Sequence, residues 1–147
     1  MSLTLRLLPT SWRGHYPHMA AGDRPIWERY LDDHAREWDH FAYDVAVGGL
    51  DPPPTVTDEA IRRAWRWNTA KRIDALGFND GAIGIFEVRP YAQVSALGAV
   101  LAYSVLLRAE LTDVRPHRLY IVTDSIPADI QFAAEHYGVT VLEFPGV

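Results

Sequence analysis

The chain has 147 residues, of which 48% are apolar and 22% charged, a balance that excludes a disordered or collagen-like protein. This length indicates one domain, spanning 1–147, with a hydrophobic core of its own. The chain contains no cysteine and has a net charge of −5. The absence of cysteine excludes disulfide scaffolds and thiolate metal sites. The negative net charge disfavours a protein that coats nucleic acid, so any DNA would bind at a local basic patch.

No apolar run approaches the roughly 18 residues of a membrane span. The apolar stretch at the start of the chain is also too short for a signal peptide. We therefore expect no membrane association. Since no glycine-rich phosphate loop occurs, we also expect no nucleotide cofactor.

Apolar periodicity and turn residues divide the chain into short strands and helices. In chain order they predict a strand at 3–8, a loop at 9–23, a helix at 24–40, a strand at 42–47, a stiff loop at 48–54, a helix at 57–69, a strand at 72–78, a hairpin turn at 79–81, a strand at 82–89, a helix at 95–110, a strand at 119–123, a helix between 127 and 138, and a strand at 139–144. This order predicts an α/β fold, a central mixed β-sheet flanked by helices, with residues 1–23 as an N-terminal extension. The helix at 95–110 is apolar almost all round, so we expect it to be deeply buried.

The predicted hairpin is the most informative segment for function. Asp80 and Gly81 are the preferred residues of a two-residue turn. In the register that such a turn sets, Asp74 lies directly opposite Glu87, with Cβ atoms about 5 Å apart. A three-residue loop would shift this register by one residue.

The same register pairs Arg72 with Arg89 and places both on the face of Asp74 and Glu87, because side chains alternate along a strand. Two carboxylates this close raise the pKa of one of them unless a cation compensates. The compensating cation is either a divalent metal or a guanidinium group.

Asp74, followed after twelve residues by Glu87, Val88 and Arg89, resembles the core motif of the PD-(D/E)XK nuclease superfamily. The segment 95–103 resembles the helix that follows this motif. The resemblance implies a restriction-endonuclease-like fold with Asp74, Glu87 and Arg89 as catalytic residues. It also implies a Mg²⁺ ion held by Asp74, Glu87 and the carbonyl group of Val88.

The chain most resembles small nuclease-like proteins of tailed bacteriophages. Their Lys-Arg-Ile-Asp, Glu-Val-Lys-Pro and Ala-Leu-Gly-Gln stretches have counterparts here at 71–74, 87–90 and 96–99. The resemblance covers 40–147 in element order and 71–103 in motifs.

Two positions depart from the motif. Arg89 stands where the superfamily has lysine, and Ala99 stands where many members have glutamine. Arginine cannot release its proton near neutral pH, so Arg89 is able to fold back onto Glu87 or Asp74 and neutralise the pair without a metal. A compositional drift is the alternative, since 13 of the 14 basic residues are arginine, but it does not explain Ala99.

Other charged residues have two interpretations each. Glu28 or Asp32 would supply the extra acid that some superfamily members carry, or would lie on a solvated helix face. The basic residues of the helix at 57–69 and its surroundings would contact nucleic acid or pair with surface acids; they are Arg62, Arg63, Arg66 and Lys71. Trp65 on that helix is expected to pack inward.

Two functions follow from the resemblance and its departures. The first is a non-catalytic protein of nuclease fold that serves as a structural component of a phage-type particle, at the neck between head and tail. Its partners would be other virion proteins or further copies of itself, in the virion or the host cytoplasm. The alternative is an active Mg²⁺-dependent endonuclease that acts on the phosphodiester bonds of DNA.

Overall fold

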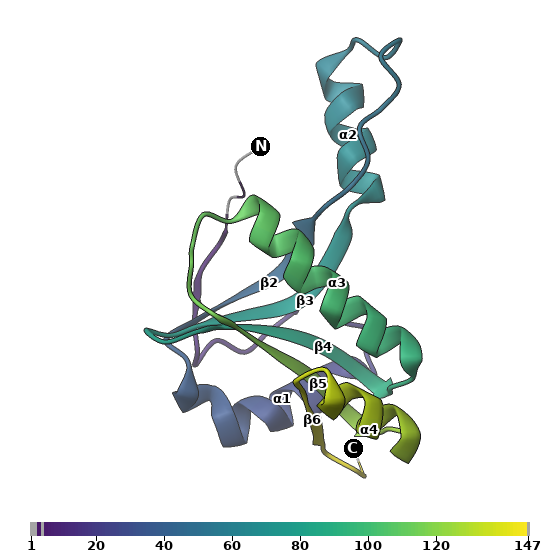
Figure 1. Ribbon diagram of the computed structural model, residues 1–147. Helices are drawn as coiled ribbons and strands as arrows, with labels where there is room; N and C mark the ends of the chain where they lie inside the picture. Colours follow the sequence, from purple (N-terminus) through teal and green to yellow (C-terminus); the bar gives the residue numbers. More distant parts are fainter. Residues whose placement is uncertain (1–2, 4, 147) are drawn as a thin grey trace.

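Figure 1 shows the computed structural model, which describes residue 3 and residues 5–146. Its elements are, in chain order, β1 (Leu8–Pro9), α1 (Asp23–His34), the 3-10 turn η1 (Ala35–Glu37), β2 (His40–Val47), α2 (Glu59–Thr69), β3 (Lys71–Phe78), β4 (Ile83–Tyr91), α3 (Val94–Glu110), β5 (His117–Ser125), α4 (Ala128–His136) and β6 (Val139–Glu143). Every helix and strand expected after residue 23 is present; the first helix ends early, at His34, and the other ends shift by at most two residues.

The described strands form one six-stranded sheet in the order β1-β2-β3-β4-β5-β6. Strands β1 to β4 run antiparallel to their neighbours, whereas β4, β5 and β6 are parallel. Helices α3 and α4 cover one face of the sheet and α1 covers the other (Figure 1). The expected α/β fold, a mixed sheet flanked by helices, is therefore confirmed.

Helix α1 is held on the sheet by an aromatic and aliphatic face. Ile26, Trp27, Tyr30 and Leu31 recur at helical spacing, and each is at most 1% exposed. The indole ring of Trp27 meets the ring of Phe86 on β4 edge to face, with 5.1 Å between their centroids. Burial of this face fixes α1 against the middle of the sheet.

The helix expected to reach residue 40 ends at His34, because Trp38 turns toward the sheet and is buried there. Gly77 and Gly84 pair across β3 and β4 directly beneath its ring. A Cβ atom at Gly84 would lie 2.6 Å from the Trp38 ring, so the paired glycines provide the space it occupies. Tertiary packing of one tryptophan thus overrides the helical pattern.

Two further expectations differ from the structure. The strand expected at 3–8 is reduced to Leu8 and Pro9, and proline has no N–H to extend the pairing; residue 4 lies outside the described residues. Helix α3 is not deeply buried all round, because the sheet covers only one side of it and leaves Val105 71% exposed. Within the described part of the chain, neither α3 nor another helix is long and apolar enough to cross a membrane.

Between β2 and β3 the chain leaves the sheet as a projection of residues 48–70, called the arm below, which carries α2 (Figure 1). Its root turns through Gly48 and Gly49, whose φ angles of 71° and 96° are in the left-handed region. A Cβ atom at Gly49 would lie 2.6 Å from the carbonyl oxygen of Arg66, so only glycine fits there. Every residue of α2, all of them described, is exposed or half-buried.

Candidate functional site

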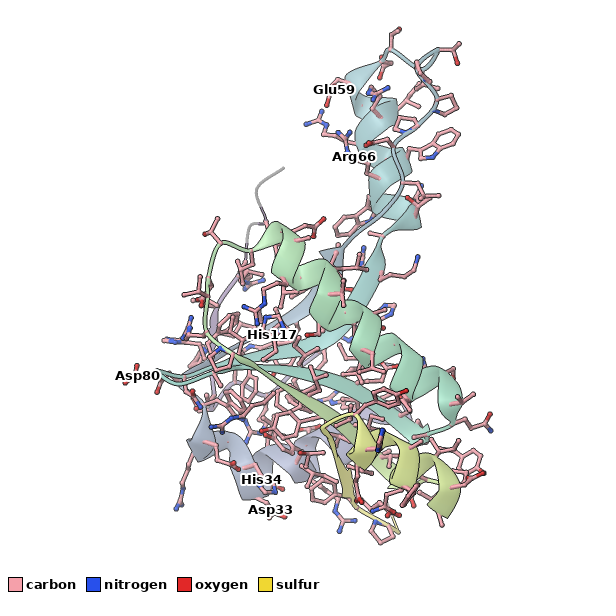
Figure 2. All side chains as sticks on the ribbon, in the orientation of Figure 1. Asp33, His34, Glu59, Arg66, Asp80 and His117 are labelled. Atoms are coloured by element: carbon pink, nitrogen blue, oxygen red, sulfur yellow. The ribbon has the colours of Figure 1, made fainter. Side chains whose placement is uncertain are left out.

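The β3–β4 hairpin has the register predicted from its turn. The N–H of Asn79 donates to the carbonyl of Ala82 at 3.2 Å, and Asp80 lies at the tip (Figure 2). The ladder continues to the pair Ala75–Phe86. The two-residue turn therefore sets the alignment that brings the two acidic residues of the motif to the same level.

Strands β3 and β4 separate beyond that pair. β3 stays paired with β2 down to Lys71, while β4 pairs with β5. In the resulting fork the Val88 N–H donates to Oδ2 of Asp74 at 2.8 Å, so a side chain replaces the missing main-chain partner. Asp74 lies beside Glu87 as predicted, but across a fork rather than in a continuous ladder.

A cleft of about 320 Å³ opens at this fork. It is lined by His18, Asp23, Asp74, Glu87, Val88, Arg89, Pro90, Tyr91 and Tyr103. The two motif carboxylates are buried, with Asp74 6% and Glu87 2% exposed. The side chain of Arg89 also lines the cleft and remains 41% exposed.

Glu87 is satisfied by side chains from two directions. Nε of Arg89 donates to its Oε2 at 2.6 Å, and the hydroxyl of Tyr103 on α3 donates to its Oε1 at 3.4 Å. Arg89 is itself placed by Nη1, which donates to Oγ of Ser95 at 3.5 Å. The fold-back of Arg89 onto Glu87, one of the two alternatives for this arginine, is the arrangement in the structure.

The electrostatics of the cleft favour a neutral pair. Burial, followed by the neighbouring Glu87 carboxylate, raises the pKa of Asp74 to about 8. Burial opposes the charge on Arg89, but the Glu87 carboxylate outweighs it and raises the arginine pKa. Burial and then Glu87 also raise the pKa of Tyr103, which therefore remains a hydrogen-bond donor at neutral pH. One proton on Asp74 and one guanidinium against Glu87 leave this group of side chains without net charge.

Arg72 does not lie with Asp74 and Glu87, so that prediction is wrong. Its Nε and Nη2 donate to the two carboxylate oxygens of Asp44 on β2, at 2.9 and 3.1 Å. Its guanidinium also stacks on the ring of Trp67 at 3.7 Å.

The reason is a break in side-chain alternation at this level of the sheet. Ala42 and Val45 on β2 pack in the same core cluster although they are three residues apart, and Ile73 and Leu76 on β3 do the same. Between the first two lies Asp44, whose φ of 52° is in the left-handed region. Because of this break, residues before Asp74 on β3 point to the opposite face of the sheet from the one that strict alternation predicts. Arg72 therefore points away from the cleft.

The acid that α1 contributes to the cleft is Asp23, its first residue. Burial raises the pKa of Asp23, and His18 in the preceding loop lines the same cleft. Neither Glu28 nor Asp32 lines the cleft: Glu28 is half-buried and accepts from Nε of Arg24 at 2.9 Å, and Asp32 is 73% exposed on the helix surface. In the sequence, Asp23 indicated only the start of a helix, and no pattern indicated that it also lines the cleft.

Two of the three α2 arginines are engaged within the arm. Nη1 of Arg62 donates to the carbonyl of Val56 at 2.8 Å. Arg66 lies 3.5 Å from Asp51 and 3.6 Å from Glu59, and Figure 2 shows Arg66 and Glu59 on α2, away from the sheet. These arginines therefore stabilise the arm itself.

Arg63 differs from them: it is exposed, and among the described residues it has neither an ion pair nor a side-chain hydrogen bond. Nζ of Lys71 donates to the carbonyl of Thr69 at 3.3 Å. Trp65 is 39% exposed, so the expectation that it packs inward is wrong. A nucleic-acid role for these basic residues stays a prediction.

A Mg²⁺ ion in the cleft would need ligands from the motif carboxylates. In residue 3 and residues 5–146, no three His, Cys, Asp or Glu side chains gather as a metal-holding group. Of the two motif carboxylates, Glu87 is bonded to Arg89, and Asp74 favours its protonated form. Mg²⁺ requires several oxygen ligands in octahedral geometry, and carboxylates bind it in ionised form. With Arg89 bonded to Glu87 and a proton on Asp74, Mg²⁺ would bind here only by displacing both.

The fold and the cleft define an α/β protein with a buried, internally neutralised carboxylate pair at the fork of a β-hairpin. Comparison of the chain with protein-family models, with curated proteins and with solved structures finds no match. The resemblance to PD-(D/E)XK nucleases accordingly stays a prediction from the sequence.

Proposed function

We propose that this chain is a non-catalytic protein with a restriction-endonuclease-like fold that serves as a structural component of a phage-type particle, in the neck between head and tail. The observation that carries the proposal is the bond from Nε of Arg89 to Glu87, 2.6 Å long, in the cleft where the superfamily holds its metal.

The chemistry of the cleft supports a lost activity. A guanidinium keeps its proton at every pH at which the protein is folded, so it cannot accept a proton from an attacking water molecule. The guanidinium also compensates the negative charge of the Glu87 carboxylate, as a metal ion would. The raised pKa of Asp74 favours the protonated form of this carboxyl group, which carries no charge.

The face of α3 beside the cleft gives independent support. Ser95, Ala99 and Tyr103 recur at intervals of four residues and therefore share one side of the helix. Tyr103 lines the cleft and contacts Glu87, while Ser95 contacts the cleft residue Arg89. Ala99 lies between them with no polar atom to offer, so the loss of the motif glutamine leaves a gap in the donors on this side.

Titration calorimetry of Mg²⁺ and Mn²⁺ into the purified protein tests the proposal, with Asp74→Ala and Glu87→Ala as controls. We expect no binding that depends on either carboxylate. Metal binding that disappears in both variants would overturn the non-catalytic assignment.

A reversion series sharpens this test. We expect Arg89→Lys alone to remain inactive on DNA with Mg²⁺, because Ala99 also departs from the motif. Activity gained by Arg89→Lys combined with Ala99→Gln would support descent from a nuclease.

The second candidate function is a Mg²⁺-dependent DNA endonuclease. It is favoured by the presence of Asp23, Asp74 and Glu87 in one cleft together with Val88. Asp74, Glu87 and the Val88 carbonyl would hold the metal, which lowers the pKa of a bound water, and Arg89 would clamp the phosphate. This function requires Asp74 to ionise and Arg89 to leave Glu87. Measurable cleavage by the wild type that Asp74→Ala abolishes would establish it.

A further inference from the structure

Helix α2 packs its polar side inward and leaves its apolar side exposed, the reverse of an ordinary surface helix. Its polar side packs on the arm's own loop, where Arg62 binds the Val56 carbonyl and Oγ1 of Thr69 accepts from the Leu50 N–H at 2.7 Å. The other side carries two adjacent apolar rows at helical spacing, which are Ala60, Ala64 and Trp67, and Ile61 and Trp65. An amphipathic helix ordinarily buries its apolar face against a partner.

The body of the molecule does not cover this face. Ile61 and Trp67 are each 54% exposed, and Trp65 is 39% exposed. At the root of the arm, Ala64 and Trp67 border an open hollow of about 450 Å³, and the Arg72 guanidinium covers one side of the Trp67 ring. Exposed tryptophan is enriched at protein interfaces because it buries a large area at low entropic cost.

Helix α4 carries a second unpartnered apolar group. Phe132 is 76% exposed, and Tyr137 just beyond the helix is 62% exposed. Asp129 and Glu135 stand three residues to either side of Phe132, so both share its side of the helix. This face therefore has an aromatic centre with a carboxylate at each end.

The two helices lie in segments of opposite net charge. Residues 59–72 hold five of the fourteen basic residues and one of the nineteen acidic residues. Residues 119–147 hold four acidic residues and neither lysine nor arginine. Figure 1 shows α2 and α4 at opposite ends of the molecule, so one copy cannot bring its own two faces together.

We propose that the apolar face of α2 in one copy docks on the Phe132 face of α4 in a second copy, with Arg63 among the carboxylates that flank Phe132. The contact joins two different surfaces, so it is head-to-tail, and repeated copies form a ring or a filament. The proposal names a partner for the structural role proposed above and in that respect rests on it.

The size of the surfaces predicts a weak single contact. Two helices of 11 and 9 residues bury less than the roughly 1,200 Å² of a stable interface. Association is therefore expected to depend on protein concentration and to weaken as salt screens the opposite charges.

Sedimentation velocity over the micromolar to millimolar range tests the contact. The arm variant Ile61→Ser with Trp65→Ser and the α4 variant Phe132→Ser each remove one surface without touching a buried residue. We expect each variant alone to associate at least about thirtyfold more weakly than the wild type, the size of an interface hot-spot loss. Val105→Ser is the matched control, because Val105 on α3 is 71% exposed and lies outside both surfaces.

Mixing the two variants isolates the head-to-tail geometry. The arm variant keeps an intact α4 and the α4 variant keeps an intact arm, so an equimolar mixture is expected to form dimers and nothing larger. Full association of the α4 variant alone would overturn the proposal in favour of an arm-to-arm contact. A wild type that stays monomeric but binds duplex DNA through Arg63 would overturn it in favour of nucleic acid.

A charge exchange gives an independent measurement. We expect Arg63→Glu to weaken association and Asp129→Lys with Glu135→Lys in the second copy to restore part of it. Absence of any restoration, with Phe132→Ser also without effect, would overturn the assignment of α4. Metal-dependent cleavage by a protein that still self-associates would overturn only the proposed function, whereas a monomeric protein without activity would overturn only this contact.

Discussion

Helices α1 and α2 have similar lengths, and each places an apolar stripe with tryptophan at helical spacing, yet their environments are opposite. Trp27 on α1 is fully buried against the sheet, whereas Trp65 on α2 is 39% exposed. The difference arises because α1 returns across the sheet while α2 projects with the arm (Figure 1). An amphipathic pattern therefore indicates that a face can be covered, and the path of the chain decides whether this molecule covers it.

The largest expected effect separates the two tryptophans directly. Trp27→Ala leaves a cavity among aromatic side chains and is expected to lower the free energy of unfolding by about 3–5 kcal/mol. Trp65→Ala, the same change at a 39% exposed position in the arm, is expected to lower it much less, by about 1 kcal/mol in the monomer. Urea denaturation at low protein concentration measures both. Equal losses would mean that the arm is packed on the body in solution.

The pH dependence tests the buried charge of the body. Asp74 has a pKa of about 8 in the folded state and an ordinary value near 4 when unfolded. Between these pH values the folded chain holds a proton on Asp74 that the unfolded chain releases. The contribution of this proton to the free energy of unfolding is fully present below about pH 4 and is lost as pH rises toward 8, by at most about 1.4 kcal/mol per pH unit.

Asp74→Asn keeps a neutral side chain at every pH and is expected to remove this fall. Denaturation of wild type and variant at a series of pH values gives the comparison, and the six histidines are common to both. Parallel pH profiles would contradict the assignment of the proton to Asp74.

A third comparison concerns one arginine from each region. Arg89→Met leaves Glu87 buried without its guanidinium and is expected to cost about 1–3 kcal/mol, toward the lower end because the arginine is 41% exposed. Arg63→Met in the arm is expected to cost less than about 0.5 kcal/mol.

The double variant Glu87→Gln with Arg89→Met checks the reason for that loss. We expect it to be more stable than the sum of the two single changes predicts, since no uncompensated charge remains. Strict additivity would show that the two side chains do not interact in solution.

The smallest effect compares two Arg–Asp pairs. Asp44→Asn weakens the bidentate bond to Arg72, whose side chain is 20% exposed, and is expected to cost about 1 kcal/mol. Asparagine tolerates the left-handed φ at this position, so backbone strain is not added. Asp51→Asn removes the exposed contact to Arg66 in the arm and is expected to be neutral to within about 0.5 kcal/mol. Thermal unfolding of both variants gives the difference, and a larger loss for Asp51→Asn would reverse the order expected from burial.

Local rules account for much of the fold and part of the cleft. The Asp80–Gly81 turn predicted the register that aligns Asp74 with Glu87, because a two-residue turn leaves one alignment. The same reasoning failed for Arg72, since alternation breaks at Asp44 and at Asp74 together. That break depends on how β2 and β3 leave the sheet for the arm, which no local pattern records.

The sequence by itself determined the α/β class, the order of the elements, the hairpin register and the two alternatives for Arg89. These depend on turn preference, periodicity and proton affinity, all of which act over a few residues. Only the tertiary structure decided that Arg89 binds Glu87, that Asp23 joins the cleft and that the apolar face of α2 stays exposed. Those outcomes depend on which distant segments meet, and packing of the whole chain sets that.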